Sequence, residues 1–161
     1  MTLETTPVSY STEGNYRIVF VDAIAGAAIT ASEFDSGDDL TYSFTPDGWN
    51  PSQSQVAVSD ERLTLEQVLE RPGKKTKSLS VKYVDTATGG ATAALVEGTA
   101  GFVVVRPLIA NETAGAADQK VVVWPIICGE QMDDPPVANG VGTKSQMLFV
   151  TAAVNRQTMA A

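Results

Sequence analysis

The segment RPGKKTKSLSVKYV, residues Arg71–Val84, joins a cluster of cations to a regular alternation of apolar and polar side chains. In its second half, Leu79, Val81 and Tyr83 alternate with serines and a lysine. Because successive side chains of a strand point to opposite faces, this alternation predicts a half-buried β-strand. The fold is therefore expected to be built around strands that have one apolar face.

The preceding segment, Arg62–Gly73, allows two interpretations. As a helix it has a possible capping threonine, but its leucines do not keep the spacing of a helical face. As a strand it places Leu63, Leu65 and Leu69 on one face. We favour the strand. The Pro-Gly pair at 72 and 73 then forms a turn, and the two strands form a hairpin with a basic connecting loop.

Further strands are predicted at Tyr16–Ala23, Asp39–Trp49, Gly101–Leu108, Lys120–Gly129 and Lys144–Val154. The second of these should end at the turn formed by residues 46–48, and Asn50–Gln55 should be a loop. Pro125 lies inside a predicted strand. Because proline cannot donate to a sheet ladder, that strand is expected at a sheet edge or at a bulge.

Two short stretches favour helix. Ala91–Val96 contains good helix formers and is followed by Gly98, while Thr30–Gly37 could form a single turn with Thr30 or Ser32 as its cap. The order of elements predicts a mainly β fold, a two-sheet sandwich or barrel with one flanking helix. We expect one domain over residues 1–161, with about ten N-terminal and seven C-terminal residues extended or flexible.

The composition excludes several kinds of chemistry. The chain has 161 residues, no histidine and one cysteine, Cys128. An internal disulfide, a cysteine zinc site and histidine-based catalytic triads are therefore impossible. No pair of carboxylates suggests another active site, so we predict no enzyme and no cofactor. No apolar run approaches the ~20 residues that cross a bilayer, so no membrane association is expected.

The charge is unevenly distributed along the chain. Residues 1–61 hold ten acidic residues and one cation, whereas residues 62–161 hold nine acidic residues and ten cations, for a net charge of -8. The acidic half argues against tight nucleic-acid binding. The asymmetry fits copies that meet with opposite charges facing each other, or else an acidic surface that keeps the protein dissolved.

Two motifs suggest small-ligand sites, but neither has the full pattern of such a site. The Gly73-Lys74 pair lacks the upstream glycine, the Ser or Thr and the following helix of a phosphate-binding loop. Asp35–Asp39 lacks the spacing, the glycine and the final glutamate of a calcium loop. Neither motif therefore predicts a catalytic or metal site. The features that are left are strand faces and loops, which suit assembly with other subunits.

Three motifs, taken in order, resemble the major tail tube proteins of long-tailed phages of actinobacteria. They are EFDSGDDLT at Glu33–Thr41, GKKTKSLSVKY at Gly73–Tyr83 and GTAGFVVVR at Gly98–Arg106, followed by a late strand after a Pro-Val-Ala-Asn turn. The resemblance implies two packed sheets with a helix on the flank. It also implies hexameric rings that stack into a tube with a lumen through which double-stranded DNA passes without specific binding.

The same resemblance implies a place and partners. The protein would be part of the virion, assembled in the host cytoplasm, and would meet tape measure, tail tip and tail terminator proteins as well as copies of itself. Another phage β-protein, such as a head-tail joining or capsid decoration protein, remains the alternative.

Specific residues follow from this interpretation. A basic hairpin tip is expected to contact the acidic region of a neighbouring subunit or ring through Arg71, Lys74, Lys75 and Lys77. If the leucines of Arg62–Glu70 face the core, the opposite face should line the lumen or lie on the outside of the tube. The lumen candidates are Glu66 and Glu70, with Asp47 a weaker one. An acidic lumen would repel the phosphate backbone.

Overall fold

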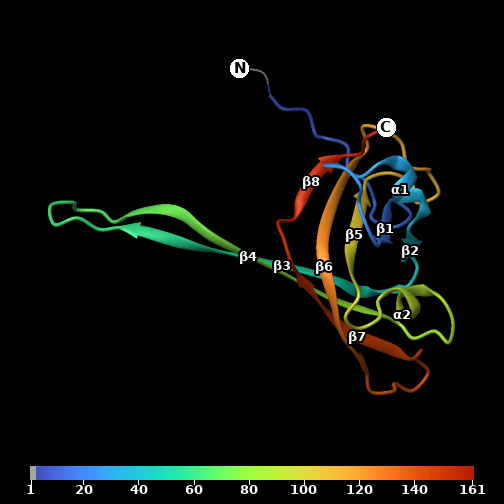
Figure 1. Cartoon of the computed structure of the whole chain (residues 1–161). Coiled ribbons are helices and arrows are strands. Elements are labelled where there is room, and N and C mark those ends of the chain that lie inside the picture. The colour runs from blue at the N-terminus through green and yellow to red at the C-terminus, as the bar shows by residue number, and fades with distance from the viewer. Residues whose placement is uncertain (1–2) are drawn as a thin grey trace.

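The structure is a computed structural model that describes residues 3–161, and it shows a body from which a long hairpin projects (Figure 1). We call residues 52–78, the part of this hairpin outside the body, the arm. The elements are β1 (Tyr16–Val21), α1 (Ala31–Ser36), β2 (Asp38–Asp39), β3 (Phe44–Asp60), β4 (Leu69–Val84), α2 (Gly90–Ala94), β5 (Ala100–Pro107), β6 (Lys120–Asp133), β7 (Thr143–Val150) and β8 (Asn155–Thr158).

The strands form an antiparallel sheet in the order β2-β1-β5-β6-β7-β4-β3, and β8 pairs with β6 outside this path. The predicted mainly β fold is confirmed. Within the residues that the structure describes, all eight strands belong to one hydrogen-bonded sheet, and two short helices lie against it where one was expected. The predicted strands of β1, β5, β6 and β7 are present.

Strand β6 changes its hydrogen-bonding partner along one edge at Pro125. Before this residue β6 pairs with β8, from Lys120 to Val123, and after it with β7, from Ile126 onward. The carbonyl of Pro125 accepts a hydrogen bond from the N–H of Thr151 in the connection between the two partners. The prediction of a sheet edge is thus wrong, and the register shift that β6 contains lies after Pro125, between Cys128 and Gln131. The missing N–H is tolerated in a central strand because the partner changes at that point.

Two cores lie on opposite faces of the sheet. Alternate residues of β1 separate between them, with Ile18 and Phe20 in the main core and Val19 and Val21 in a second core beneath α1. The second core contains Phe34 from α1. Strands buried on both faces read as continuous apolar runs, which explains the composition of β1 and β5.

The first half of the hairpin differs from its prediction. The residues at 46–48, expected to end a strand, form an irregularity inside β3, where the register shifts between Phe44 and Trp49. A Cβ at Gly48 would collide with the carbonyl oxygen of Lys82, so glycine permits this close approach. Asn50–Gln55, expected to be a loop, pairs with β4. Turn-forming residues here make a bulge, and the strand continues.

The second half differs as well. Arg62–Glu70, predicted as a strand facing the core, contains the turn of the hairpin, and only its last two residues belong to β4. Leu63 in this turn is fully exposed. The Pro-Gly pair at 72 and 73, predicted to turn the chain, lies within β4 beside a register shift between Gln55 and Ala57 of β3. Here too, residues typical of a turn form an irregularity within a strand.

The helices and the C-terminus complete the body. Helix α1 begins at the predicted cap, where Thr30 and Glu33 form a capping box. Helix α2 is shorter than expected and ends at Ala94, with Leu95 as its C-cap. The C-terminal residues, expected to be loose, form β8, and Met159 is buried in the second core.

Candidate assembly surfaces

The arm has few contacts outside itself. Strand β4 pairs with β7 only from Leu79 to Val84, so its preceding residues are hydrogen-bonded to β3 alone. Figure 1 shows the arm extending far from the body, on the side opposite α1 and β2. An isolated two-stranded hairpin is marginally stable in water. The arm therefore receives little stabilisation from the body.

The outer part of the arm carries apolar side chains without an internal core to receive them. These are Val56, Val58, Leu63, Leu65, Val68 and Leu69, with relative exposures of 61%, 53%, 104%, 43%, 48% and 48%. Exposed apolar side chains gathered in one place mark interaction surfaces. We call these six residues the apolar tip.

The four predicted contact cations lie along the arm. Lys74, Lys75 and Lys77 are in its half nearer the body, and Arg71 is close to the turn, opposite Val58. Lys75 is opposite Gln55 and Lys77 opposite Gln53 in the β3–β4 ladder. The ammonium nitrogen of Lys77 lies 5.9 Å from the ring centre of Trp124, at the root of the arm. Lys74 and Lys75 are exposed. Within residues 3–161, these three lysines form no ion pair with a carboxylate.

Arg71 differs from the lysines because it has a partner. Its guanidinium is 2.8 Å from a carboxylate oxygen of Asp60, which also binds Arg62 at 3.1 Å. Hydrogen bonds from Arg62 and then Arg71 hold the pKa of the Asp60 carboxyl below its ordinary value. These groups fix the two strands where the hairpin turn begins. The contact role of Arg71 stays a prediction.

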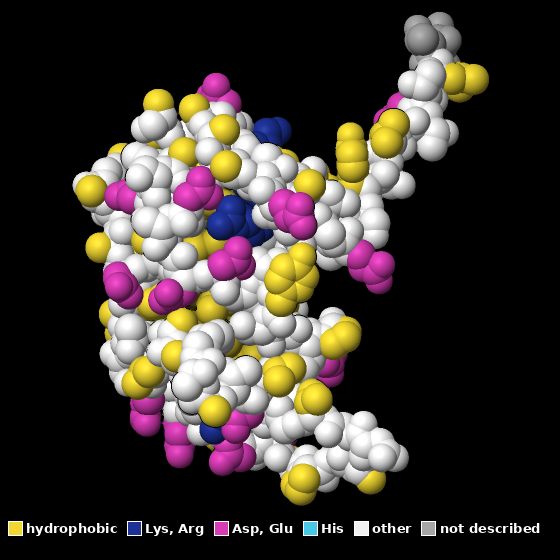
Figure 2. All heavy atoms as spheres, turned by 90° about the vertical axis from the view of Figure 1, so that its right-hand side faces the viewer, with side chains coloured by type: hydrophobic (Ala, Val, Ile, Leu, Met, Phe, Trp, Pro, Cys, Tyr) yellow, Lys and Arg dark blue, Asp and Glu magenta, His cyan; other side chains and the backbone are white. Residues whose placement is uncertain are grey.

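The face opposite the arm is acidic. In Figure 2, Asp and Glu side chains are spread over this face around a small basic centre. Exposed members near α1 and β2 include Asp22, Asp35, Asp38 and Asp39. Arg17 bridges Asp35 and Asp39 at 3.0 Å each. The hydroxyl and backbone N–H of Thr41, followed by Arg17, lower the pKa of Asp39 against an opposing effect of burial.

A second cation lies beneath this face and was not identified from the sequence. The side chain of Arg106 is completely buried and carries its guanidinium 5.3 Å from the ring centre of Phe34. It donates to the carbonyls of Ala110 and Ala114 and to the side chain of Gln119 at 3.0–3.3 Å. Burial and nearby Arg17 lower its pKa. Arg106 thereby fixes the loop after β5. The sequence offered one indication of this role, because Arg106 is a lone cation at the end of the apolar stretch GTAGFVVVR.

A further apolar patch lies on the outer face of β6 and β7. Ile127 and Phe149 are directly paired across the two strands and are 40% and 57% exposed. Met132 and Met147 are exposed on the same two strands, at 57% and 43%. Sequence alternation predicted the strands but did not indicate that their outer face would be apolar.

A family model for the phage tail tube protein matches residues 3–161, nearly the whole chain. This chain belongs to the phage tail tube protein family. It is therefore a structural component of a phage tail and of the virion. No curated protein matches the sequence.

The fold of this tail tube protein also occurs in a solved assembly. It is similar to a chain in a structure described as the anti-feeding prophage baseplate, six-fold symmetrised, with a TM-score of 0.59 and 12% identity. The alignment covers 96% of this chain and 97% of the other. At this identity the similarity concerns the fold.

The predicted lumen residues of the tail tube protein do not form one surface in a single subunit. Glu66 lies in the hairpin turn and Glu70 is paired with Ser59, whereas Asp47 lies in the body within the bulge of β3. Glu70 and Lys82, which faces that bulge, are separated by about 40 Å along β4 at 3.3 Å per residue. The argument that the leucines of Arg62–Glu70 face the core is wrong, since they are exposed. The lumen assignment stays a prediction.

Residues 3–161 hold no group of three or more His, Cys, Asp or Glu side chains that could bind a metal ion. No helix among them is both long and apolar enough to cross a bilayer.

Proposed function

We propose that this protein polymerises into the tail tube of a long-tailed phage of actinobacteria. Subunits close into hexameric rings, the rings stack, and the genomic DNA leaves through the lumen. The observation that carries the proposal is the arm, because it presents an apolar tip that its own body cannot cover, in a chain of the tail tube family. Burying an exposed Leu or Val side chain contributes about 1.5–3 kcal/mol.

The arrangement of charge supports head-to-tail contact between copies. The basic part of the arm and the acidic face lie on opposite sides of the body (Figures 1 and 2). A contact between unlike surfaces of identical subunits can close into a ring or continue as a stack. We infer that Lys74, Lys75 and Lys77 meet the acidic face of a neighbour. Exposed pairs contribute about 0–1 kcal/mol each, so their joint effect is what counts.

The remaining roles follow from the tube. Glu66, Glu70 and Asp47 from six copies would place acidic groups toward the bore, where they repel the DNA phosphates. The protein acts without catalysis, is assembled in the host cytoplasm, and contacts the tape measure, tail tip and tail terminator proteins at the ends of the tube. Closure across subunits also covers the free sheet edges.

The test combines electron microscopy with light scattering of the purified protein. We expect tubes or stacked rings for the wild type and loss of both when Leu63, Leu65 and Leu69 are all changed to Asp. A matched control changes three exposed polar residues of the arm, Ser52, Ser54 and Thr76, to Asp and should retain assembly. Monomers or trimers at high wild-type concentration, even with tail tip complex present, would contradict the tube and favour a joining or decoration protein.

A further inference from the structure

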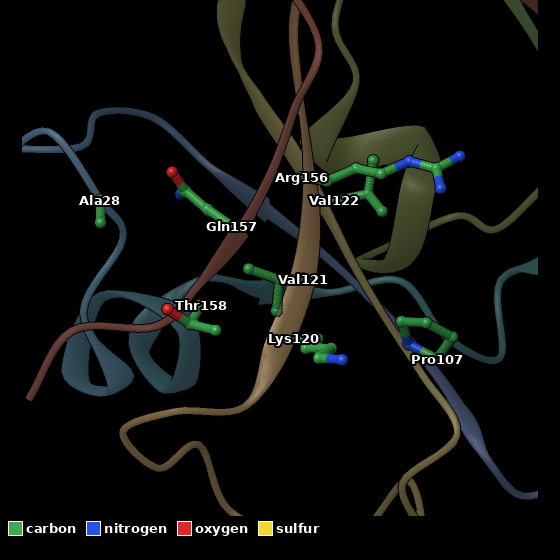
Figure 3. Close-up of a pocket in the computed structure, with 8 residues that line it drawn as sticks. All are labelled: Ala28, Pro107, Lys120, Val121, Val122, Arg156, Gln157 and Thr158. Atoms are coloured by element: carbon green, nitrogen blue, oxygen red, sulfur yellow. The ribbon is translucent and has the colours of Figure 1, made fainter.

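A groove beside β8 has the character of a binding site for an extended chain. It has a volume of about 670 Å³ and is formed where β6 and β8 meet the end of β5. Pro107 and Val122 contribute its apolar lining, and Val121, which also borders it, points to the opposite side of β6 into the second core. In Figure 3, the side chains of Lys120 and Arg156 extend to the same side as Val122 and Pro107. The groove thus combines an apolar floor with two cations.

The backbone next to this groove can accept another strand. Strand β8 pairs with β6, and no other strand within residues 3–161 pairs with it. One edge of β8 therefore presents N–H and C=O groups that lack a ladder partner. Such an edge can be extended by a peptide whose alternate side chains enter an adjacent groove.

The N-terminal segment has the complementary properties. Residues 3–11 have no regular structure and are all exposed, including Leu3, Val8 and Tyr10 at 86%, 79% and 61%. In an extended conformation, Glu4, Val8 and Tyr10 point to the same face, because they are an even number of residues apart. That face offers two apolar side chains and one carboxylate to a groove with an apolar floor and two cations.

The geometry at the base of this segment directs it away from its own body. The N–H of Asn15 donates to the carbonyl of Thr12, and its side chain donates to the carbonyl of Ser11, which forms a tight turn with Gly14 at φ 72°. Asn111 holds the end of this turn, because its backbone N–H donates to the carbonyl of Gly14 and its side-chain oxygen accepts from the N–H of Tyr16. Figure 1 shows the N-terminal segment leading outward from this point.

We propose that the groove beside β8 receives the N-terminal segment of a second copy of this chain, as an added strand along β8. Val8 and Tyr10 enter the apolar floor, and Glu4 pairs with Lys120 or Arg156. The proposal rests on the proposed self-assembly, and it assigns to each subunit both the donor segment and the acceptor groove. If each subunit inserts its N-terminal segment into the groove of a neighbour, the two subunits are linked even where their bodies do not touch.

The test uses two variants, Val8→Cys and Thr158→Cys, that are purified separately and mixed under mild oxidation. The native Cys128 does not interfere, because it is buried and burial raises its pKa to about 11. We expect covalent dimers about tenfold above those from a control mixture of Val8→Cys and Val137→Cys, since docking raises the effective concentration of the thiols. Val137 is exposed in the loop before β7.

Three outcomes are informative. No excess of dimer in the mixture overturns the inference, and the presence of wild-type tubes in the micrographs then decides the proposed function separately. A chain carrying both Val8→Cys and Thr158→Cys that closes an internal disulfide, with no dimer in the mixture, shows docking within one chain and also overturns it. Glu4→Lys should lower the dimer yield, and Lys120→Glu with Arg156→Glu should restore the yield with that variant.

Discussion

The two ends of β4 show how differently one strand is used in the body and in the arm. Leu79, at the body end, is completely buried between β3 and β7, whereas Leu69, at the outer end, is 48% exposed. At the body end of β4, apolar side chains point into the core and polar ones point away from it. At the outer end, the side chains on both faces of the strand point to solvent. The body is stabilised by its own core, and the arm carries apolar surface that only another molecule can cover.

Alanine substitutions at these two leucines provide the strongest test of that difference. Leu79→Ala should lower the free energy of unfolding by about 2–5 kcal/mol, because it creates a cavity in the main core. Leu69→Ala should change it by less than about 0.5 kcal/mol. Denaturation with urea measures both. Equal losses at the two positions would show that the arm is part of the cooperative fold of the isolated subunit.

Two arginines extend the comparison to charged groups. Arg106→Met should lower the free energy of unfolding by about 1–3 kcal/mol, because the carbonyls of Ala110 and Ala114 lose a buried charged donor. Arg71→Met in the arm removes an exposed ion pair with Asp60 and should have a much smaller effect. Hydrogen exchange of the loop after β5 should rise only in the first variant. Unchanged protection of that loop would contradict the anchoring role of Arg106.

The sequence predicted correctly those strands and helix ends whose side chains are buried or hydrogen-bonded within a single subunit. The alternation of Leu79, Val81 and Tyr83 and the cap of α1 at Thr30 depend on burial and hydrogen bonds inside one chain. Hence the mainly β fold and most strands could be predicted.

The arm could not be predicted in the same way, because its apolar residues are not directed at an internal core. The leucines of Arg62–Glu70 were assigned to the interior on the assumption that apolar means buried. The Pro- and Gly-containing stretches at 46–48 and 72–73 signalled turns, yet pairing over the full length of the hairpin turned both into irregularities within strands. Strand β8 lacks an apolar pattern and is fixed mainly by pairing with β6 and by the burial of Met159.

Charge reversal on the arm should affect assembly and leave the body intact. Changing Lys74, Lys75 and Lys77 to Glu should slow tube formation at low salt and reverse its response to salt, because salt weakens the attraction in the wild type and screens the repulsion from an acidic neighbour in the variant. The melting temperature should stay close to that of the wild type. Replacing the same lysines by Arg keeps the charge and serves as the control. Wild-type assembly kinetics after reversal would refute the contact, and light scattering at several salt concentrations measures it.

The smallest expected effect concerns the capping box in the body, which depends on pH. The Glu33 carboxylate accepts hydrogen bonds from the backbone N–H groups of Ala25 and Thr30 at 2.8 and 2.9 Å, and these bonds lower its pKa. A carboxyl whose folded pKa is depressed contributes stability above its unfolded pKa, and that contribution is lost as the pH falls through the folded value. Glu33→Gln should therefore be less stable than the wild type at neutral pH, with the difference shrinking in acid.

Two further variants separate this effect from a general loss of charge. Thr30→Ala removes the other half of the capping box and should cost about 1 kcal/mol, because the N–H of Glu33 loses its acceptor. Glu70→Gln, on the exposed arm, should leave unfolding unchanged at both pH values, since no core element depends on it. Thermal unfolding at neutral and acid pH measures all three. If Glu33→Gln stays below the wild type by the same amount in acid, the carboxylate is not the group that makes the cap sensitive to pH.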